Sequence, residues 1–366
     1  MRIGIVSKWF NRGQPVVGRY LRSAFDELGH ETFVLARPKK ERGPRPGALD
    51  RDDVWDQPGI TEASNFEVPL GEYERWIADN GIEAVFCDQN YQFEELATLR
   101  RNRTRVVGRF VWEHFAGEHV DGALEAYDLI YSMTRAEQER YREWGIETPY
   151  VQWGCHPELT SIEPHREDGV VRCIFPGGFI GHRKPVNEVV EAFVRTTDPR
   201  LRLLVKAQVD RRMEEASKVA AGDERIEIQL EDQARGDHLQ QFADCDVCVA
   251  ISRWEGLGLP LYEAIAFGMP VITNDVAPMN EPIRDGVNGL LVRSHPDGTA
   301  KSGITAYLPD VEALAAALDR IAETELWDQL AAGAREAREE RSWSKTVEGM
   351  DSLLKQLEGV PSGVAE

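Results

Sequence analysis

The chain has 366 residues and a net charge of −20, and 42% of its residues are apolar. This length is typical of two domains, and the apolar fraction is large enough for a core in each. Because both halves are acidic, the chain is not expected to bind nucleic acid or to bind stably to an anionic membrane surface.

The first half alternates short apolar runs with amphipathic stretches. The apolar runs predict strands at 2–7, 32–37, 83–88, 105–112, 128–133 and 149–154. Residues 17–29 and 135–145 are predicted helices with one apolar face, and each ends at a glycine. No run is long enough to span a bilayer, and the first ten residues resemble a strand rather than a signal peptide. We therefore expect a cytoplasmic protein.

The same alternation starts again after the polar stretch 162–169. Strands are predicted at 170–178, 201–207, 225–230, 246–252, 270–275 and 289–292, with helices such as 185–196 and 236–245 between them. The alternation predicts an α/β chain with two Rossmann-like units. We place the first domain at 1–165, the second at 166–344, and a C-terminal helix at 345–366.

Two segments fit neither sheet. Residues 37–60 are rich in proline, glycine and charge, and residues 293–310 form a second insertion. Loops of this length are typically either mobile or functional.

Two basic clusters interrupt the acidity, Arg37–Arg45 and Arg100–Arg109. They indicate either solvated loops and strand edges or a site for a phosphate-bearing or acidic acceptor.

Five scattered cysteines argue against a disulfide framework. Cys245 and Cys248 match C-x-x-C, but they lie in a predicted strand, where residues three apart point to opposite faces. No second pair completes a zinc set, so we predict structural cysteines and no metal site.

The stretch 253–275, RWEGLGLPLYEAIAFGMPVITND, places two glutamates around a loop of glycine, leucine and proline. Pro260 suits the first turn of a helix that ends at Gly268, with Glu263 in the first turn and Glu255 on the preceding loop. Glycines and a helix N-terminus at the carboxyl end of a parallel strand favour a phosphate. The two carboxylates then suit hydroxyl groups. The alternative is that Glu263 only complements the helix dipole and Glu255 is solvated.

This stretch resembles the E-x7-E signature of the retaining glycosyltransferases of family four, which have the GT-B fold. Further resemblance lies in FNRGQPVVGRYLRSAFDELGHE, PGGFIGHRKPVNEVVEAF, MNEPIRDGVNGLLV and RSWSKTVEGM, which together span nearly the whole chain. The resemblance implies two Rossmann-like domains facing a cleft, with a C-terminal helix that crosses back to the first domain.

The resemblance also implies roles. Glu255 would contact the donor sugar, Glu263 the ribose hydroxyls, and Lys184 the leaving diphosphate. The family has an arginine where Phe179 stands, and Arg183 either replaces that charge or faces solvent. The remaining implied donor contacts are the backbone of Leu257, Gly258 and Leu259, Gly13 across the cleft, and His114 near the reacting centre.

The expected reaction is transfer of a sugar from a nucleoside-diphosphate-sugar to an acceptor hydroxyl, with retention and without metal or cofactor. The D-x-D at Asp50–Asp53 lies in the proline-rich loop, so we discount it as a metal site. The alternatives are an epimerase or phosphorylase of the same fold, or a non-catalytic sugar-nucleotide-binding partner subunit. We expect at most transient membrane association, and a homodimer stays open.

Overall fold

The computed structural model describes residues 1–38, 49–209 and 213–359. It divides into an N-terminal unit, Met1–Gln152 with the returning segment from Ser344, and a C-terminal unit, Trp153–Trp343. The first division lies before residue 153, earlier than the predicted 165/166. Residues 153–165 are anchored in the C-terminal unit, because Cys155 N donates to Arg341 O at 2.8 Å and His165 N to Asp244 Oδ1 at 2.8 Å.

The N-terminal unit is built on a six-stranded parallel sheet in the order β3-β2-β1-β4-β5-β6. Its strands are β1 (Arg2–Lys8), β2 (Glu31–Arg37), β3 (Ile60–Glu62), β4 (Ala84–Asp88), β5 (Arg105–Arg109) and β6 (Leu129–Ile130). Its helices are α1 (Gly13–Glu27), α2 (Leu70–Asn80), α3 (Phe93–Arg101), α4 (Val120–Ala126) and α5 (Arg135–Glu143), with 3-10 turns η1 (Asp53–Trp55) and η2 (Gly117–His119).

The structure differs from the prediction at two places in this unit. Strand β3 was not predicted; it begins at Ile60, the last residue of the proline-rich stretch, with Val34 of β2 beside Ile60. The predicted strand at 149–154 is reduced to an isolated parallel bridge between Tyr150 and Ser132, in which Val151 N donates to Ser132 O at 2.9 Å and Ser132 N donates to Pro149 O at 3.0 Å. Residues 39–48, which include most of the first basic cluster, lie outside the described residues.

The C-terminal unit repeats the arrangement, with a parallel sheet in the order β12-β11-β10-β7-β8-β9. Its strands are β7 (Val171–Phe179), β8 (Leu201–Val209), β9 (Ile226–Leu230), β10 (Val247–Val249), β11 (Val271–Asn274) and β12 (Gly289–Val292). Its helices are α6 (Pro157–Thr160), α7 (Val186–Val194), α8 (Glu214–Ala220), α9 (Arg235–Ala243), α10 (Leu259–Ala266), α11 (Val311–Ile321) and α12 (Thr324–Glu340).

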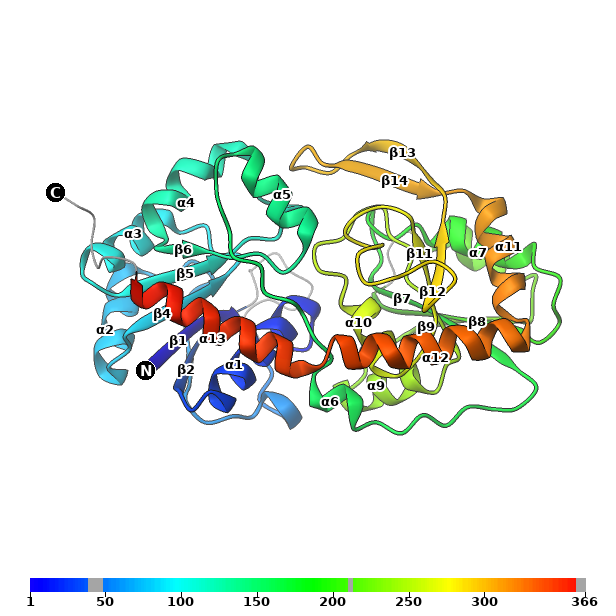
Figure 1. The fold of residues 1–366 in the computed structure, drawn as a ribbon, viewed down its shortest axis with the longest axis horizontal. Helices are drawn as coiled ribbons and strands as arrows, with labels where there is room; N and C mark the ends of the chain where they lie inside the picture. Colours follow the sequence, from blue (N-terminus) through cyan, green and yellow to red (C-terminus); the bar gives the residue numbers. More distant parts are fainter. Residues whose placement is uncertain (39–48, 210–212, 360–366) are drawn as a thin grey trace. The chain divides into compact units, whose positions relative to one another are not determined.

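The insertion at 293–310 forms a hairpin of its own. Strands β13 (Ser294–Thr299) and β14 (Thr305–Pro309) pair antiparallel as a separate two-stranded sheet. Figure 1 shows this hairpin standing apart from the six-stranded sheet of its unit. The prediction that this segment joins neither parallel sheet is confirmed.

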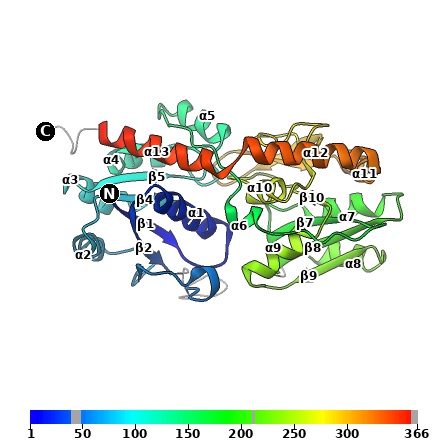
Figure 2. The same ribbon diagram turned by 60° about the horizontal axis from the view of Figure 1, so that its bottom comes forward.

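The C-terminal helix α13 (Trp343–Gly359) enters the N-terminal unit from Ser344 onward. It buries Met350, Leu353, Leu354 and Leu357. In Figures 1 and 2 it runs beside α1 in the N-terminal unit.

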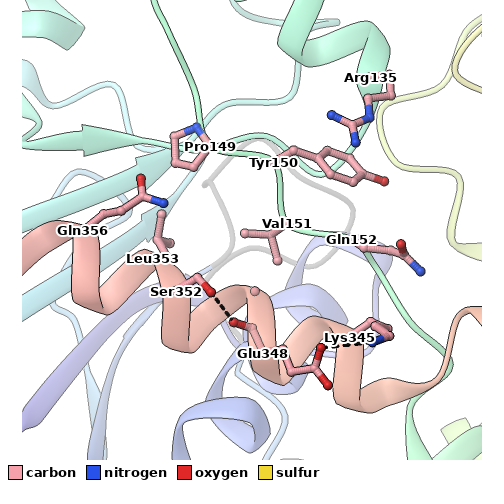
Figure 3. Close-up of a pocket in the computed structure, with 11 residues that line it drawn as sticks. Arg135, Pro149, Tyr150, Val151, Gln152, Lys345, Glu348, Ser352, Leu353 and Gln356 are labelled. Carbon is pink, nitrogen blue, oxygen red and sulfur yellow. Dashed lines mark hydrogen bonds and ion pairs between the residues drawn. The ribbon is translucent and has the colours of Figure 1, made fainter.

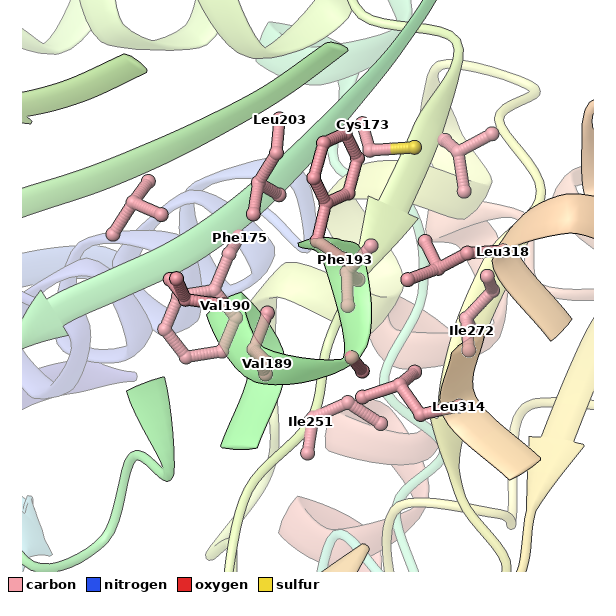
Figure 4. Packing of buried hydrophobic residues seen from close by; sticks show 14 of the residues in the cluster. Cys173, Phe175, Val189, Val190, Phe193, Leu203, Ile251, Ile272, Leu314 and Leu318 are labelled. Carbon is pink, nitrogen blue, oxygen red and sulfur yellow. The ribbon is translucent and has the colours of Figure 1, made fainter. Parts of the chain in front are cut away.

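Each sheet has an apolar core because helices cover both of its faces, which explains the nearly continuous apolar runs in the sequence. Figure 4 shows the core of the C-terminal unit, where Phe175 and Leu203 of the sheet lie with Phe193 of α7 and Leu314 and Leu318 of α11. In both units the first strand lies third or fourth in the order, and the next strands extend to opposite sides. The order of the strands therefore switches from one side of the sheet to the other at this strand. Open α/β sheets bind ligands at the carboxyl ends of the strands at such a switch point.

Candidate active site

The loop with the two glutamates leaves β10 at the carboxyl edge of the C-terminal sheet. It leads into α10, which begins at Leu259 with Pro260 in its first turn. Gly258 caps the helix with φ of +76° and ψ of 52°, a left-handed conformation that L side chains rarely adopt. A Cβ at Gly258 would lie 2.8 Å from Leu261 Cδ1. The predicted strand, glycine turn and helix are all present.

Glu255 lies at the centre of a buried polar cluster. Its Oε1 accepts hydrogen bonds from Lys184 Nζ at 2.7 Å and from Ser252 Oγ at 2.7 Å. Lys184 Nζ also lies 2.6 Å from Ser252 Oγ. The second carboxylate oxygen pairs with Arg183, whose side chain is 35% exposed. Two cations that follow β7 therefore meet one carboxylate that follows β10.

This cluster sets the charge of Glu255. Burial raises the pKa of the carboxyl, but Arg183 and Lys184 oppose it with the larger combined effect, and the pKa falls to about 2. Burial lowers the pKa of Lys184, and Glu255 acts against that shift. Glu255 is thus ionised at neutral pH, where it can accept hydrogen bonds but cannot donate a proton.

Glu263 differs from Glu255 in place and in charge. It is the fifth residue of α10, so the expected position in the first turn is wrong, and no acidic residue lies in that turn. The carboxylate is buried, with Arg235 Nη2 at 3.6 Å from its Oε1. Burial raises the pKa of Glu263, Arg235 lowers it, and Glu158 adds a further rise. Glu263 thus lies past the first turn, where the helix dipole acts most strongly, and a hydroxyl could supply the hydrogen bond that the distant Arg235 supplies weakly.

The other predicted donor residues lie around the same loop. Leu257 is buried, Leu259 is half-buried at the start of α10, and Phe179 is the last residue of β7. The Arg183 side chain is partly exposed, but it also forms an ion pair with Glu255. The structure thus brings together Arg183, Lys184 and Glu255.

Gly13 and His114 belong to the N-terminal unit. Gly13 is the exposed first residue of α1. His114 lies in a turn after β5, where its side chain is 60% exposed and its Nε2 is 3.7 Å from Glu113 Oε1. Its backbone N–H donates to Val111 O at 2.9 Å. An exposed histidine at the carboxyl end of a strand is free to meet a ligand, so its predicted role stays a prediction.

Sequence reasoning missed part of the charged framework. Ser252 could have been noticed, because it lies three residues before Glu255 in the same loop. Arg235 and Glu158 carried no motif, and only folding brings them to Glu263, with Arg235 Nε 3.4 Å from Glu158 Oε1.

Three arginines of the second basic cluster, 100–109, form ion pairs within their own unit. Arg100 pairs with Asp128 at 2.9 Å, Arg101 with Glu125 at 3.1 Å and Arg109 with Glu137 at 2.8 Å. These three arginines are thus part of the unit's own framework, while Arg103 is exposed, so a site for a phosphate-bearing or acidic acceptor stays a prediction.

The N-terminal unit has a hollow of about 330 Å³ between α13 and the segment that follows α5. Figure 3 shows Val151 and Leu353 in this hollow, with Tyr150 beside Arg135. The Arg135 guanidinium lies 3.7 Å from the centroid of the Tyr150 ring, and Lys345 Nζ pairs with Glu348 at 3.1 Å. None of the predicted site residues lines this hollow.

Two further observations concern metals and membranes. Among residues 1–38, 49–209 and 213–359, no three His, Cys, Asp or Glu side chains gather as a metal site would require. No helix in these ranges combines the length and apolar character that crossing a bilayer demands.

Residues 171–339, all within the C-terminal unit, match the family described as Glycosyl transferases group 1. The match covers less than half of the chain and lies in the C-terminal unit alone. A D-inositol 3-phosphate glycosyltransferase of Nocardia farcinica is 31% identical over 131 residues, which is 34% of this chain and 26% of that protein. The chain spans between 14% and 28% of the length of the curated relatives it matches.

Two solved structures resemble the whole chain. Sucrose-phosphate synthase of Thermosynechococcus elongatus has a TM-score of 0.75 at 17% identity, covering 99% of this chain and 100% of that one. The Anabaena protein HepE in complex with UDP and glucose has a TM-score of 0.68 at 14% identity, covering 97% and 100%. These likenesses establish the fold. The predicted class, two parallel-sheet Rossmann-like domains as in the GT-B glycosyltransferases, is confirmed.

Proposed function

We propose that the chain is a glycosyltransferase that moves a sugar from a nucleoside-diphosphate-sugar to an acceptor hydroxyl. One observation carries the proposal: a buried, ionised Glu255 held by Lys184 and Arg183 in front of a glycine-capped helix. This arrangement places a carboxylate that accepts hydrogen bonds from hydroxyl groups next to two cations. A sugar diphosphate needs both, because its sugar presents hydroxyls and its diphosphate carries negative charge.

The donor contacts follow from this chemistry. Glu255 accepts hydrogen bonds from sugar hydroxyls, and the more remote Glu263 accepts them from the ribose. The backbone of Leu257, Gly258 and Leu259 turns toward the diphosphate, where the first N–H groups of α10 have no partner within the helix.

Arg183 and Lys184 stabilise the leaving diphosphate. Negative charge grows on that group as the bond to the sugar breaks, and preorganised cations are most effective against charge that develops in the transition state. Arg183 supplies the cation that an arginine in place of Phe179 would have supplied. Two protein cations also allow a metal-independent reaction.

We further propose retention of the anomeric configuration, as in the family four enzymes that the sequence resembles. Glu255 does not act as a base, because a carboxyl with a pKa of about 2 is a poor proton acceptor at neutral pH. The departing phosphate oxygen then takes the acceptor proton. Gly13 and the exposed His114 contribute from the N-terminal unit, His114 near the reacting centre.

The five cysteines are free and buried, as suits a reducing compartment, and we place the enzyme in the cytoplasm. It acts on a hydroxyl-bearing acceptor that is not held in a membrane.

A panel of nucleotides and sugar nucleotides tests the proposal. The true donor raises the melting temperature of the wild type by mass action and, with a suitable acceptor, releases nucleoside diphosphate in the presence of EDTA. Glu255→Ala should lower kcat/KM by about a hundredfold or more, as the loss of a transition-state contact does. The matched control is Glu224→Ala, an exposed glutamate in the same unit, which should keep wild-type activity.

Three results would contradict parts of this proposal. Wild-type turnover by Glu255→Ala would remove the assigned role of that residue. Activity lost in EDTA and restored by magnesium would overturn metal independence. Binding of a sugar nucleotide without any turnover across a panel of acceptors would favour a non-catalytic partner subunit.

A further inference from the structure

Arg253 joins three segments of the C-terminal unit through its backbone. It lies two residues before Glu255, and its N–H donates to Arg183 O at 2.8 Å. Its carbonyl accepts from the N–H of Tyr307, in β14, at 2.9 Å. The loop that carries Glu255 is therefore tied to the loop that carries Lys184 and, on its other side, to the β13–β14 hairpin.

The side chain of Arg253 repeats this connection. Its Nη1 donates to His182 O at 3.2 Å, and its Nη2 contacts both the backbone carbonyl and the carboxylate of Asp297, in β13. The guanidinium also lies 5.6 Å from the centroid of the Trp254 ring. A planar guanidinium presents its donors in a rigid fork, which suits partners that lie in two different directions.

Two of the acceptors of Arg253 are the carbonyls of His182 and Arg183, the residues that immediately precede Lys184. His182 and Arg183 have no regular secondary structure, because β7 ends at Phe179 and α7 begins at Val186. Their position is thus set by hydrogen bonds such as these. Asp297 in turn fixes the direction of the Arg253 guanidinium from outside the six-stranded sheet.

We propose that the β13–β14 hairpin is a positioning element for the donor site, and that Arg253 and Asp297 are its positioning residues. The hairpin holds Arg253, Arg253 holds the carbonyls of His182 and Arg183, and the Arg183 and Lys184 cations are thereby kept against Glu255. The inference rests on the proposed function for its effect on the donor, but the mechanical connection can be tested without a donor.

Hydrogen–deuterium exchange tests the connection directly. In Arg253→Gln and Asp297→Ala, the amides of the segment 180–185, in which Pro185 has none, should exchange about three- to tenfold faster than in the wild type, as expected for the loss of a partly exposed charged pair. Arg293→Gln is the matched control. It removes an ion pair of 3.0 Å with Asp310 next to the same hairpin, and should leave residues 180–185 unchanged. Wild-type exchange in both Arg253→Gln and Asp297→Ala would overturn the inference.

Nucleotide binding tests the functional consequence. The probe is the nucleoside diphosphate that most raises the wild-type melting temperature. Its Kd should rise about three- to tenfold in Arg253→Gln and Asp297→Ala, less in Arg253→Lys, and not in Arg293→Gln.

The two tests separate the two hypotheses. A wild type that binds no nucleoside diphosphate contradicts the proposed function, while faster exchange at 180–185 would still support the hairpin's role. A wild type that binds, with unchanged Kd in both Arg253→Gln and Asp297→Ala, contradicts the hairpin's role and leaves the proposed function standing.

Discussion

Each unit contains a buried ion network at the carboxyl ends of its strands, and the two networks differ in exposure. In the N-terminal unit, Arg109 lies between Glu137, at 2.8 Å, and Asp88, at 3.4 Å, and its side chain is only 1% exposed. In the C-terminal unit, Glu255 lies between Lys184 and Arg183, and Arg183 reaches solvent. The first is one cation between two carboxylates, and the second is one carboxylate between two cations.

The difference determines the charge state of each carboxyl. Burial raises the pKa of Asp88 and of Glu137, and Arg109 only partly opposes it, since one cation serves both. Two cations serve Glu255, so its pKa falls to about 2 despite burial. The enclosed network around Arg109 is suited to stabilising the fold. The open network around Glu255 includes a partly exposed cation, Arg183, which a ligand can reach.

The largest expected effect comes from the enclosed network. Arg109→Met leaves two buried carboxylates without their cation and should lower the free energy of unfolding by about 3–5 kcal/mol. The loss of stability should be smaller at low pH, because protonation of Asp88 and Glu137 removes the buried negative charges that no longer have a cation. Urea denaturation measures it, with Arg101→Met, an exposed ion pair, as a control that changes by less than about 1 kcal/mol. Equal effects of the two changes would show that the Arg109 network does not stabilise the fold.

Glu255→Gln should have the next largest effect on stability, about 3 kcal/mol at pH 7. The pKa of Glu255 in the folded protein, about 2, is below its ordinary value of 4.5, so its ionised form stabilises the fold. That stabilisation is complete above pH 4.5 and is lost as pH falls toward 2. The difference between wild type and variant should therefore narrow in denaturation curves taken between pH 5 and about pH 3.

Glu263→Gln should show the opposite dependence of stability on pH. The pKa of Glu263 is raised, so its ionised form is disfavoured in the folded protein. The stability of this variant relative to the wild type should improve as pH rises. The same trend for both variants would contradict the assigned charge states.

The smallest stability change is expected at the exposed edge of the open network. Arg183→Gln should cost less stability than Glu255→Gln, because Lys184 and Ser252 still hold the carboxylate and Arg183 is itself partly exposed. It should nevertheless raise the Kd for the stabilising nucleoside diphosphate by about tenfold, the loss of one charge-assisted contact. Calorimetry measures both quantities, and a large stability loss with unchanged Kd would make Arg183 structural.

Local features of this chain could be read from its sequence. The alternation of apolar runs and amphipathic stretches predicted both sheets, since strands buried on two faces require such runs. Pro260 and Gly268 predicted where α10 begins and ends, because their backbone preferences are local. The short β3 and the irregular 149–154 segment were misread, because pairing with a neighbour decides whether such short runs become strands.

What only the tertiary structure decided is which charges meet. The sequence determined that Glu255 lies on a loop after a strand and that Lys184 lies on another, but not that both share Ser252 or that Arg183 joins them. It did not show that Arg253 ties these loops to Asp297 of the hairpin. Local preferences act over a few residues, while the pKa of a carboxyl depends on every charge that folding brings near it. The sequence therefore determined the local structure of the loop that carries Glu255. Its electrostatics depend on the tertiary structure, which brings the loop after β7 against the loop after β10.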